Sequence, residues 1–203
     1  MEKKLLGITA GKIQFSDIRI EKITEDDLNK LSSFSCGNNL LDSFFHKEVV
    51  VCDQCHMFSA YCVKYNNAII AAFTLANDSL FLESDDKDDI ASAFSNNKSM
   101  TNDRIYKDYF GKSNSFPAIN IGHLAVRTDY QSKGVGEYII RYLRYRFANY
   151  NVSGCLFITV DSLNNRRTNK FYDRNGFFFQ TTKDINKDTR RMYFPINLYR
   201  EIN

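Results

Sequence analysis

The chain has 203 residues, a length that predicts a single domain and leaves enough residues to bury a sizeable core. Hydrophobic residues make up 43% of it, and 17 Phe with 12 Tyr supply ample core-forming material, which excludes a disordered chain. The formal net charge of +3 is far below that of a nucleic-acid coat protein or a polybasic membrane anchor, so any basic partner site must be local.

The sequence carries no signal for export or for a membrane span. Its longest apolar stretch, residues 68–76, is well short of the roughly 18 residues that a bilayer-spanning helix needs. The N-terminal segment MEKKLLGITAGKIQF turns polar at Thr9 and Lys12, too early for a secretory core. Five cysteines, an odd number, favour reduced structural thiols over a disulfide framework. We therefore expect a cytoplasmic protein.

The first part of the chain predicts a strand, two helices and a hairpin. SDIRIEKI alternates like an edge strand, and Thr24 with the acidic residues after it is typical of a helix cap. A second helix is expected from Asn38 or Asn39, because apolar residues then recur at helical spacing. MFSAYCVKY and AIIAAFTLA flank Asn66 and Asn67, which tolerate the positive φ of a hairpin turn.

A polar insertion follows at about residues 78–115, with a very acidic start, and we expect it to be partly helical. After it, residues 118–126 predict a buried strand, 134–149 a helix, 155–160 a buried strand, and 164–175 another helix that ends at Gly176. FFFQ and RRMYFPI predict the last two strands, joined by a polar hairpin loop. The alternation predicts an α/β fold with one open, mixed, twisted sheet flanked by helices on both faces, in a single domain over residues 1–203.

The most informative segment is HLAVRTDYQSKGVGEYIIRYL, in which a strand, a short loop and an amphipathic helix follow one another. Two of only nine glycines lie in this loop, where backbone N–H groups and the helix N-terminus favour a bound anion. No GxxxxGK[ST] loop occurs, and the GxGxxG fingerprint fails at Tyr138 and Ile139. The segment therefore predicts a phosphate or pyrophosphate site other than those of P-loop or dinucleotide-binding proteins.

Strand, QxxGxG loop and helix together resemble the acyl-CoA pyrophosphate motif of the GCN5-related N-acetyltransferases (GNATs). A second signature of that family, an Asn, a Tyr-bearing helix and then Gly-Phe, is matched by Asn165, Tyr172, Gly176 and Phe177, with Thr168 in place of the usual small Ala. FSCGNNLLDSFF and PAINIGHLAV resemble a subgroup that includes the acetyltransferase toxins of bacterial toxin–antitoxin pairs. The long polar insertion and the length depart from the compact toxin pattern.

The resemblance implies a single GNAT-like domain that transfers an acetyl group from acetyl-CoA directly to a primary amine in a ternary complex, without an acyl-enzyme or a metal. It also implies Tyr172 as the acid that protonates the leaving thiolate, since a phenol stays protonated at neutral pH. The implied cofactor-binding residues are Leu124, Ala125, Val126, Gln131, Ser132, Lys133, Gly134, Val135, Gly136, Glu137 and Asn165. For the general base, His123, Glu83 and Asp78 stay open, and His123 fits a structural role better.

Two further patterns have competing interpretations. Cys52-Asp53-Gln54-Cys55-His56 matches CxxCH, but haem attachment needs export and zinc needs two more ligands, so we expect a helix end and a strand start. A basic cluster gives either a solvated face or a phosphate-binding surface for CoA or tRNA. It consists of Arg141, Arg144, Arg146, Arg166, Arg167, Lys170 and Arg174.

Three functional hypotheses follow. The first is acetylation of a metabolite, peptide or protein amine, and the second is a toxin-like acetyltransferase of aminoacyl-tRNA. The third is a non-catalytic acyl-CoA-binding or interaction module, against which the presence of Tyr172 and Asn165 argues. The sequence does not fix the acceptor amine, and it leaves open whether the protein forms a homodimer.

Overall fold

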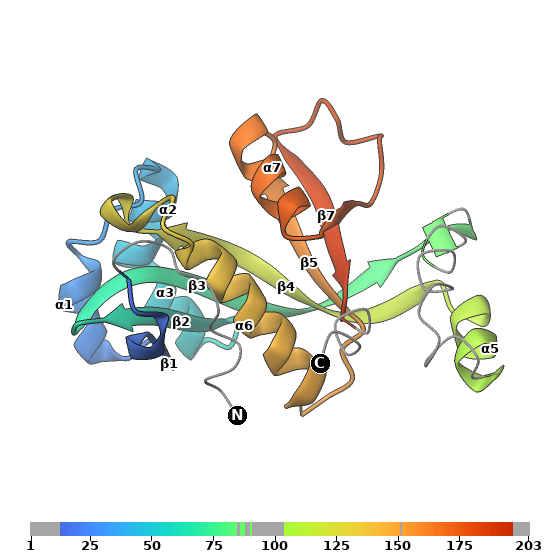
Figure 1. The fold of residues 1–203 in the computed structure, drawn as a ribbon, viewed down its shortest axis with the longest axis horizontal. Coiled ribbons are helices and arrows are strands. Elements are labelled where there is room, and N and C mark those ends of the chain that lie inside the picture. Colours follow the sequence, from blue (N-terminus) through green and yellow to red (C-terminus); the bar gives the residue numbers. More distant parts are fainter. Residues whose placement is uncertain (1–12, 85, 88–89, 91–103, 151, 197–203) are drawn as a thin grey trace. The chain divides into compact units, whose positions relative to one another are not determined.

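The computed structural model describes residues 13–84, 86–87, 90, 104–150 and 152–196. Seven strands form one sheet in the order β1-β2-β3-β4-β5-β7-β6 (Figure 1). Their bounds are β1 Arg19–Lys22, β2 Ser59–Tyr65, β3 Ala68–Phe81, β4 Ser115–Val126, β5 Phe157–Leu163, β6 Phe178–Phe179 and β7 Thr189–Pro195. β1 and β6 are edge strands, so the sheet is open, and the predicted mixed α/β fold is confirmed.

The helices follow the predicted order. They are α1 Leu28–Leu31, α2 Asn39–Lys47, α3 Val49–Gln54, α5 Arg104–Lys112, α6 Val135–Asn149 and α7 Arg166–Arg174, with short 3-10 turns η2 Phe15–Asp17, η3 Glu25–Asp27 and η4 Thr128–Tyr130. α2 begins where its sequence predicts, because the Asn38 side chain accepts hydrogen bonds from the N–H groups of Leu40 and Leu41. No helix within the described ranges is both long and apolar enough to cross a membrane.

By its internal contacts the chain divides into two compact units. The first comprises residues 1–76 and 121–141, and the second comprises residues 77–120 and 142–203. β3, β4 and α6 each run from one unit into the other. The single-domain organisation expected from the sequence stays a prediction.

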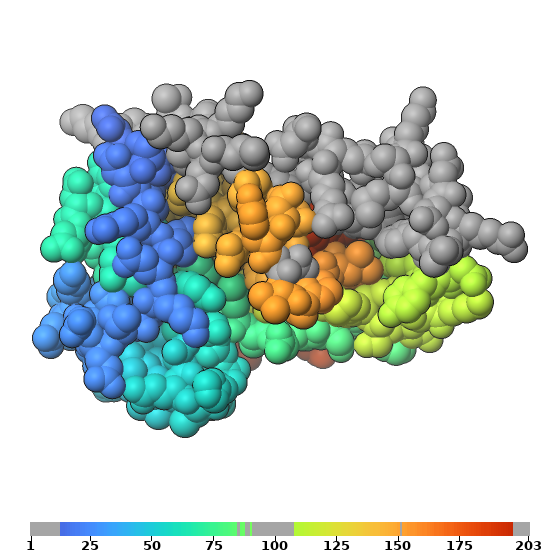
Figure 2. Space-filling model, turned by 90° about the horizontal axis from the view of Figure 1, so that it is seen from below, coloured from blue at the N-terminus to red at the C-terminus, as the bar shows by residue number. Residues whose placement is uncertain are grey.

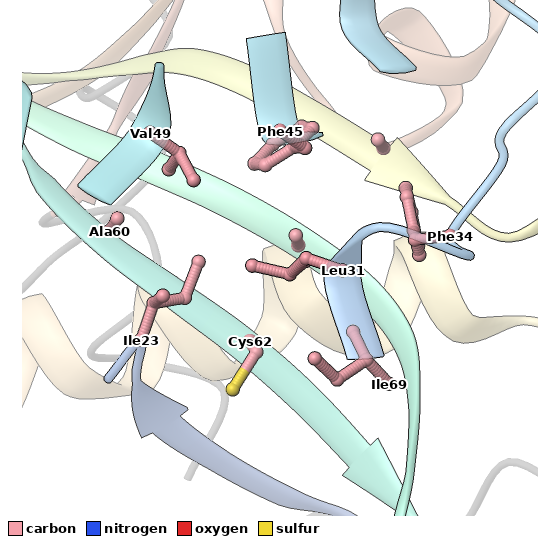
Figure 3. Packing of buried hydrophobic residues seen from close by; sticks show 10 residues of the cluster. Ile23, Leu31, Phe34, Phe45, Val49, Ala60, Cys62 and Ile69 are labelled. Carbon is pink, nitrogen blue, oxygen red and sulfur yellow. The ribbon is translucent and has the colours of Figure 1, made fainter. Parts of the chain in front are cut away.

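The core of the first unit lies between α1–α3 and the strands β2 and β3 (Figure 3). Leu31, Phe34, Phe45 and Val49 are fully or almost fully buried there. The rings of Phe34 and Phe45 pack edge to face with centroids 6.0 Å apart, an arrangement that aromatic quadrupoles favour. In the space-filling view, the segments of this unit that precede β3 (blue to cyan) form a contiguous body (Figure 2).

The β2–β3 hairpin has the turn that its sequence predicts. Asn66 and Asn67 adopt positive φ of 48° and 63°, as the two central residues of a type I′ turn require. The strands pair antiparallel, with Tyr65 opposite Ala68. β2 also pairs with β1, so the first unit contains the predicted edge strand.

A buried ion pair lies beside this core. The Asp27 carboxylate accepts hydrogen bonds from the Thr24 N–H and hydroxyl at 3.2 and 3.1 Å, and Lys64 Nζ lies 2.9 Å from Asp27 Oδ1. Burial alone would raise the pKa of Asp27, but the hydrogen bonds from Lys64 and Thr24 outweigh it and lower that pKa. Lys64 also contacts Glu21 Oε2 at 3.1 Å, so its ammonium has two acidic partners.

In the second unit the structure differs from the expected polar insertion at its start. β3 continues to Phe81, because Leu80 and Leu82 are fully buried and pack with Phe116 and Phe157 in a separate cluster. Strand β4 correspondingly begins at Ser115, three residues earlier than expected. The expected helix is present as α5, whose Phe110 ring stacks on Phe116 with centroids 4.7 Å apart. Residues 91–103 of the predicted insertion lie outside the described residues.

Candidate active site

The end of β4 leads into the glycine-containing loop. Ala125 is buried in the core of the first unit, whereas Leu124 and Val126 are half-buried and alternate to the other face of the strand. The peptide groups of these three residues therefore lie at the end of a strand that is anchored in the core by Ala125. This is the segment that the family resemblance expects to pair with pantetheine.

The loop itself has the backbone of an anion site. Ser132 and Gly134 have positive φ of 57° and 83°, and α6 starts immediately afterwards, with the Tyr138 N–H donating to the Gly134 carbonyl at 2.9 Å. The first N–H groups of a helix have no intrahelical acceptor, and within the described residues those of Val135 and Gly136 donate to no other protein group. These donors and the helix dipole favour a bound anion at this end of α6.

Two cations lie beside the loop, each over the same aromatic ring. The guanidinium of Arg127 and the ammonium of Lys133 lie 4.8 and 5.4 Å from the centroid of the Tyr130 ring. Arg127 also forms an ion pair with Asp129 at 2.7 Å, which offsets part of its charge. Lys133 is exposed within the loop, so its charge is available to a phosphate.

Gln131 faces protein carbonyls. Its side-chain Nε2 donates to the Cys36 carbonyl at 2.7 Å and to the Val126 carbonyl at 2.9 Å. Both N–H groups of the amide are therefore used within the first unit. The predicted role of Gln131 as a direct cofactor ligand stays a prediction, and any donation to phosphate would require breaking one of these bonds.

Tyr172 and Asn165 belong to the second unit, on α7 beside β5 (Figure 1). The Tyr172 ring is 5% exposed and packs edge to face on Phe171 and Phe177, with centroids 5.0 and 5.2 Å away. Within the described part of the chain its hydroxyl makes no hydrogen bond. Burial raises the pKa of Tyr172, so the phenol stays protonated at neutral pH, as a proton donor must.

Asn165 has a structural task at the start of α7. Its side chain accepts a hydrogen bond from the Thr168 N–H at 2.9 Å, which makes it the N-cap of the helix. At the other end, Gly176 adopts φ of +75° and stops the helix as predicted. The Asn and Gly of the second signature therefore both hold the helix that carries Tyr172.

His123 lies on β4 in the first unit. Its ring stacks on Phe44 with centroids 3.7 Å apart, and Nδ1 lies 3.1 Å from the Thr74 hydroxyl. Thr74 Oγ1 also accepts the His123 backbone N–H at 3.0 Å. Burial lowers the pKa of His123, which keeps the ring neutral. These contacts fit the structural role expected for His123 and leave its role as a base untested.

The other two candidates for the general base, Asp78 and Glu83, lie in the second unit and have different surroundings. The Asp78 carboxylate accepts hydrogen bonds from the Thr159 hydroxyl and from Arg191, whose guanidinium also contacts Asp161 at 2.9 Å. Both donors contact the same oxygen, Asp78 Oδ2. Glu83 is exposed, and its N–H donates to Asp86 at 3.1 Å.

The β6–β7 loop is tied down by polar residues that sequence reasoning did not single out. Asn164 Nδ2 donates to the carbonyls of Ile185 and Lys187, each at 2.8 Å. A buried ion pair joins Arg190 to Asp184 at 3.1 Å. Polarity and turn residues predicted the loop, but its anchors depend on tertiary contacts that no local pattern encodes.

The two ambiguous patterns are resolved in part. CxxCH spans the end of α3, as expected, and then a turn, since β2 starts only at Ser59 and not within the motif. In the second unit Arg166, Lys170 and Arg174 are exposed along α7, four residues apart. Arg144 differs, because its guanidinium lies 3.8 Å from the centroid of the Phe194 ring.

Comparison with known families finds a match over part of the chain. The family model described as "Acetyltransferase (GNAT) domain" matches residues 99–177. Among curated proteins, no sequence matches this chain. The matched residues include β4, the glycine-containing loop, α6 and α7.

Solved structures with a similar fold include the toxin AtaT. A tyrosine-to-phenylalanine mutant of the toxin AtaT, bound to the C-terminus of the antitoxin AtaR and acetyl-CoA, is 18% identical, with 91% of this chain and 99% of that chain covered and a TM-score of 0.64. AtaT complexed with acetyl-methionyl-tRNAfMet is 19% identical, with 92% and 99% covered and a TM-score of 0.67. A tyrosine-to-phenylalanine mutant of KacT is 17% identical, with 92% and 99% covered and a TM-score of 0.67.

Residues 99–177 thus match a GNAT acetyltransferase domain, and the chain has a fold similar to that of the toxin AtaT. The GNAT resemblance seen in its sequence is confirmed by this family model, and the toxin AtaT shares its fold. The assignment of individual site residues stays a prediction.

Proposed function

We propose that this protein transfers an acetyl group from acetyl-CoA to the amino group of an aminoacyl-tRNA, by direct attack in a ternary complex. The observation that carries acetyl-CoA as the acyl donor is the loop at residues 131–136, with its positive-φ residues and the helix N-terminus that follows. The GNAT domain match and the acetyl-CoA bound by AtaT support the same donor.

The loop fits a pyrophosphate in charge and backbone. Positive φ at Ser132 and Gly134 turns the chain so that the N–H groups at the start of α6 are open to a ligand, and Lys133 adds a mobile positive charge. Leu124, Ala125 and Val126 supply the main-chain groups for the pantetheine arm and the thioester carbonyl. When bound, acetyl-CoA supplies an activated acyl carbon and a thiolate leaving group.

In the reaction the neutral amine attacks the thioester carbonyl carbon, the C–N bond forms, and the C–S bond breaks. The departing sulfur takes up a proton, for which Tyr172 is the donor, because burial keeps its phenol protonated and its hydroxyl has no acceptor in the described part of the chain. The amine gives up its own proton to solvent, and the Tyr172 phenolate takes a proton back from solvent, which restores the acid. Asn165 acts by capping the helix that holds Tyr172.

Charged tRNA is the favoured acceptor because two observations support it. AtaT, which shares the fold over nearly its whole length, has been solved with acetyl-methionyl-tRNAfMet. In this chain Arg166, Lys170 and Arg174 present an exposed basic stripe along α7, which suits a phosphate backbone.

The first experiment is a calorimetric titration with acetyl-CoA. Wild type is expected to bind saturably, whereas a Gly134→Glu, Gly136→Glu variant, whose carboxylates occupy the anion site, should lose binding. A Gly154→Glu variant is the matched control, because a side chain there meets no atom within 4 Å. No binding by wild type would refute the enzyme hypothesis and leave an interaction module.

The second experiment offers radiolabelled acetyl-CoA with methionyl-tRNA, uncharged tRNA or free methionine. We expect label to enter charged tRNA only, and binding to weaken steeply with salt. Replacing Arg166, Lys170 and Arg174 by Ala should reduce the slope of log K against log salt by about 2–3. Labelling of free methionine or of peptide amines instead of tRNA would refute the proposal that aminoacyl-tRNA is the acceptor. Absence of growth arrest when the protein is expressed would count against a toxin.

A further inference from the structure

Within the first unit, the turn between α1 and α2 (residues 32–38) is hydrogen-bonded to the glycine-containing loop that follows β4. The Thr128 N–H donates to the Ser35 carbonyl at 2.9 Å, and Gln131 Nε2 donates to the Cys36 carbonyl at 2.7 Å. The same Gln131 nitrogen donates to the Val126 carbonyl at 2.9 Å. One amide therefore joins three segments: the turn, the end of β4 and the start of the loop.

A residue of α2 holds this turn in place. One oxygen of Asp42 accepts the Cys36 N–H at 2.8 Å, and the other accepts the Ser35 hydroxyl at 2.7 Å. Burial alone would raise the pKa of Asp42, but these hydrogen bonds outweigh it and lower that pKa, so the carboxylate stays charged. Gly37, with φ of +80°, lets the chain turn back, and a Cβ there would meet Thr128 Cγ2 at 3.4 Å.

We propose that this arrangement is a latch, in which Asp42 fixes the Ser35–Cys36 carbonyls and these carbonyls, through Gln131 and Thr128, hold the loop at residues 131–136 in its anion-binding shape. Gln131 and Asp42 are then positioning residues for acetyl-CoA, and neither needs to touch it. The inference rests on the proposed function, because it assumes that the loop binds the cofactor.

The arrangement favours a positioning role for a physical reason. A loop that binds a ligand only in one shape loses affinity in proportion to the fraction of molecules that have another shape. The loop contains two residues with positive φ, one of them the non-glycine Ser132, so its backbone is not in its intrinsically preferred state. Hydrogen bonds from outside the loop are therefore needed to keep this loop conformation populated.

The test uses two variants that break the latch at opposite ends. Gln131→Met keeps the side-chain length without the N–H groups, and Asp42→Ala removes both acceptors of the turn. Asp42→Asn is the conservative variant, because its amide oxygen still accepts the Cys36 N–H. Asp26→Ala, at an exposed acidic residue, is the control.

Hydrogen exchange of the unliganded proteins is measured first, then acetyl-CoA affinity. In both latch variants we expect faster exchange confined to residues 35–37 and 128–137, a Kd raised about tenfold, equivalent to about 1.4 kcal/mol, and nearly unchanged kcat at saturating acetyl-CoA. Asp42→Asn should recover most of the affinity, and Asp26→Ala should match wild type.

Unchanged exchange in the loop of both variants, or a Kd within twofold of wild type in both, would overturn the latch. Failure of wild type itself to bind acetyl-CoA would instead refute the proposed function. The exchange rates of the unliganded protein would still decide whether Gln131 and Asp42 hold the loop, so the two failures are distinguishable.

Discussion

Replacing Tyr172 by Phe removes a single oxygen atom and leaves the ring. The ring is 5% exposed and flanked by Phe171 and Phe177, contacts that the phenylalanine keeps. Because the hydroxyl makes no hydrogen bond within the described residues, its loss should change the free energy of unfolding by less than about 1 kcal/mol. Turnover should nevertheless fall by about 10² or more, the contribution typical of a positioned acid.

The assay follows thiol release and acetyl incorporation with whichever acceptor the labelling experiment identifies, beside a calorimetric acetyl-CoA titration. Affinity for acetyl-CoA should stay nearly intact, so the loss lies in kcat. Tyr109→Phe is the matched control, because Tyr109 is 60% exposed on α5. Turnover within about threefold of wild type for Tyr172→Phe would remove this hydroxyl from the mechanism.

Two other predictions concern the first unit. Asp27→Asn should lower the free energy of unfolding, measured by urea denaturation at neutral pH, by about 2 kcal/mol, because Lys64 then keeps only Glu21 as an acidic partner. The pKa of Asp27 in the folded protein lies below its ordinary 3.8, so the difference in stability from wild type should shrink as the pH falls through that range. A difference that stays constant with pH would contradict this prediction. Asp26→Asn is the exposed control. The His123 ring should titrate in NMR spectra with a pKa below 6.5, because burial disfavours its charged form. Phe44→Ala removes the ring that stacks on His123 and should move this pKa towards 6.5. A wild-type pKa at or above 6.5 would show that burial does not govern the titration of His123.

Much of the fold could be predicted because local chemistry and tertiary packing agree. Asn38 caps α2, Asn66 and Asn67 make the hairpin turn, and Gly176 ends α7, each by the backbone preference that the residue type has on its own. β3 was longer than expected, since Leu80 and Leu82 follow Asn77, Asp78 and Ser79, polar residues whose composition indicated a loop. Burial of these leucines against Phe116 outweighs that local polarity.

The site was predictable only where its chemistry resides in the backbone. Glycine spacing and a helix start predicted an anion-binding loop, and the structure has positive φ at Ser132 and Gly134 there, because such backbone geometry is a property of a short segment. The amide of Gln131 could not be placed from sequence, since its two acceptors belong to residues 36 and 126, one of which is distant in the chain. Asn164 and Arg190 were missed for the same reason.

The passage of β3, β4 and α6 through both units sets an order of events during synthesis. Residues 13–76 emerge from the ribosome first, yet their unit also requires residues 121–141. At about 5–20 residues per second, several seconds pass before Ala125, the member of the buried cluster contributed by the later stretch, is added. Because each unit is assembled from two separate stretches of the chain, neither unit corresponds to one continuous segment of the gene.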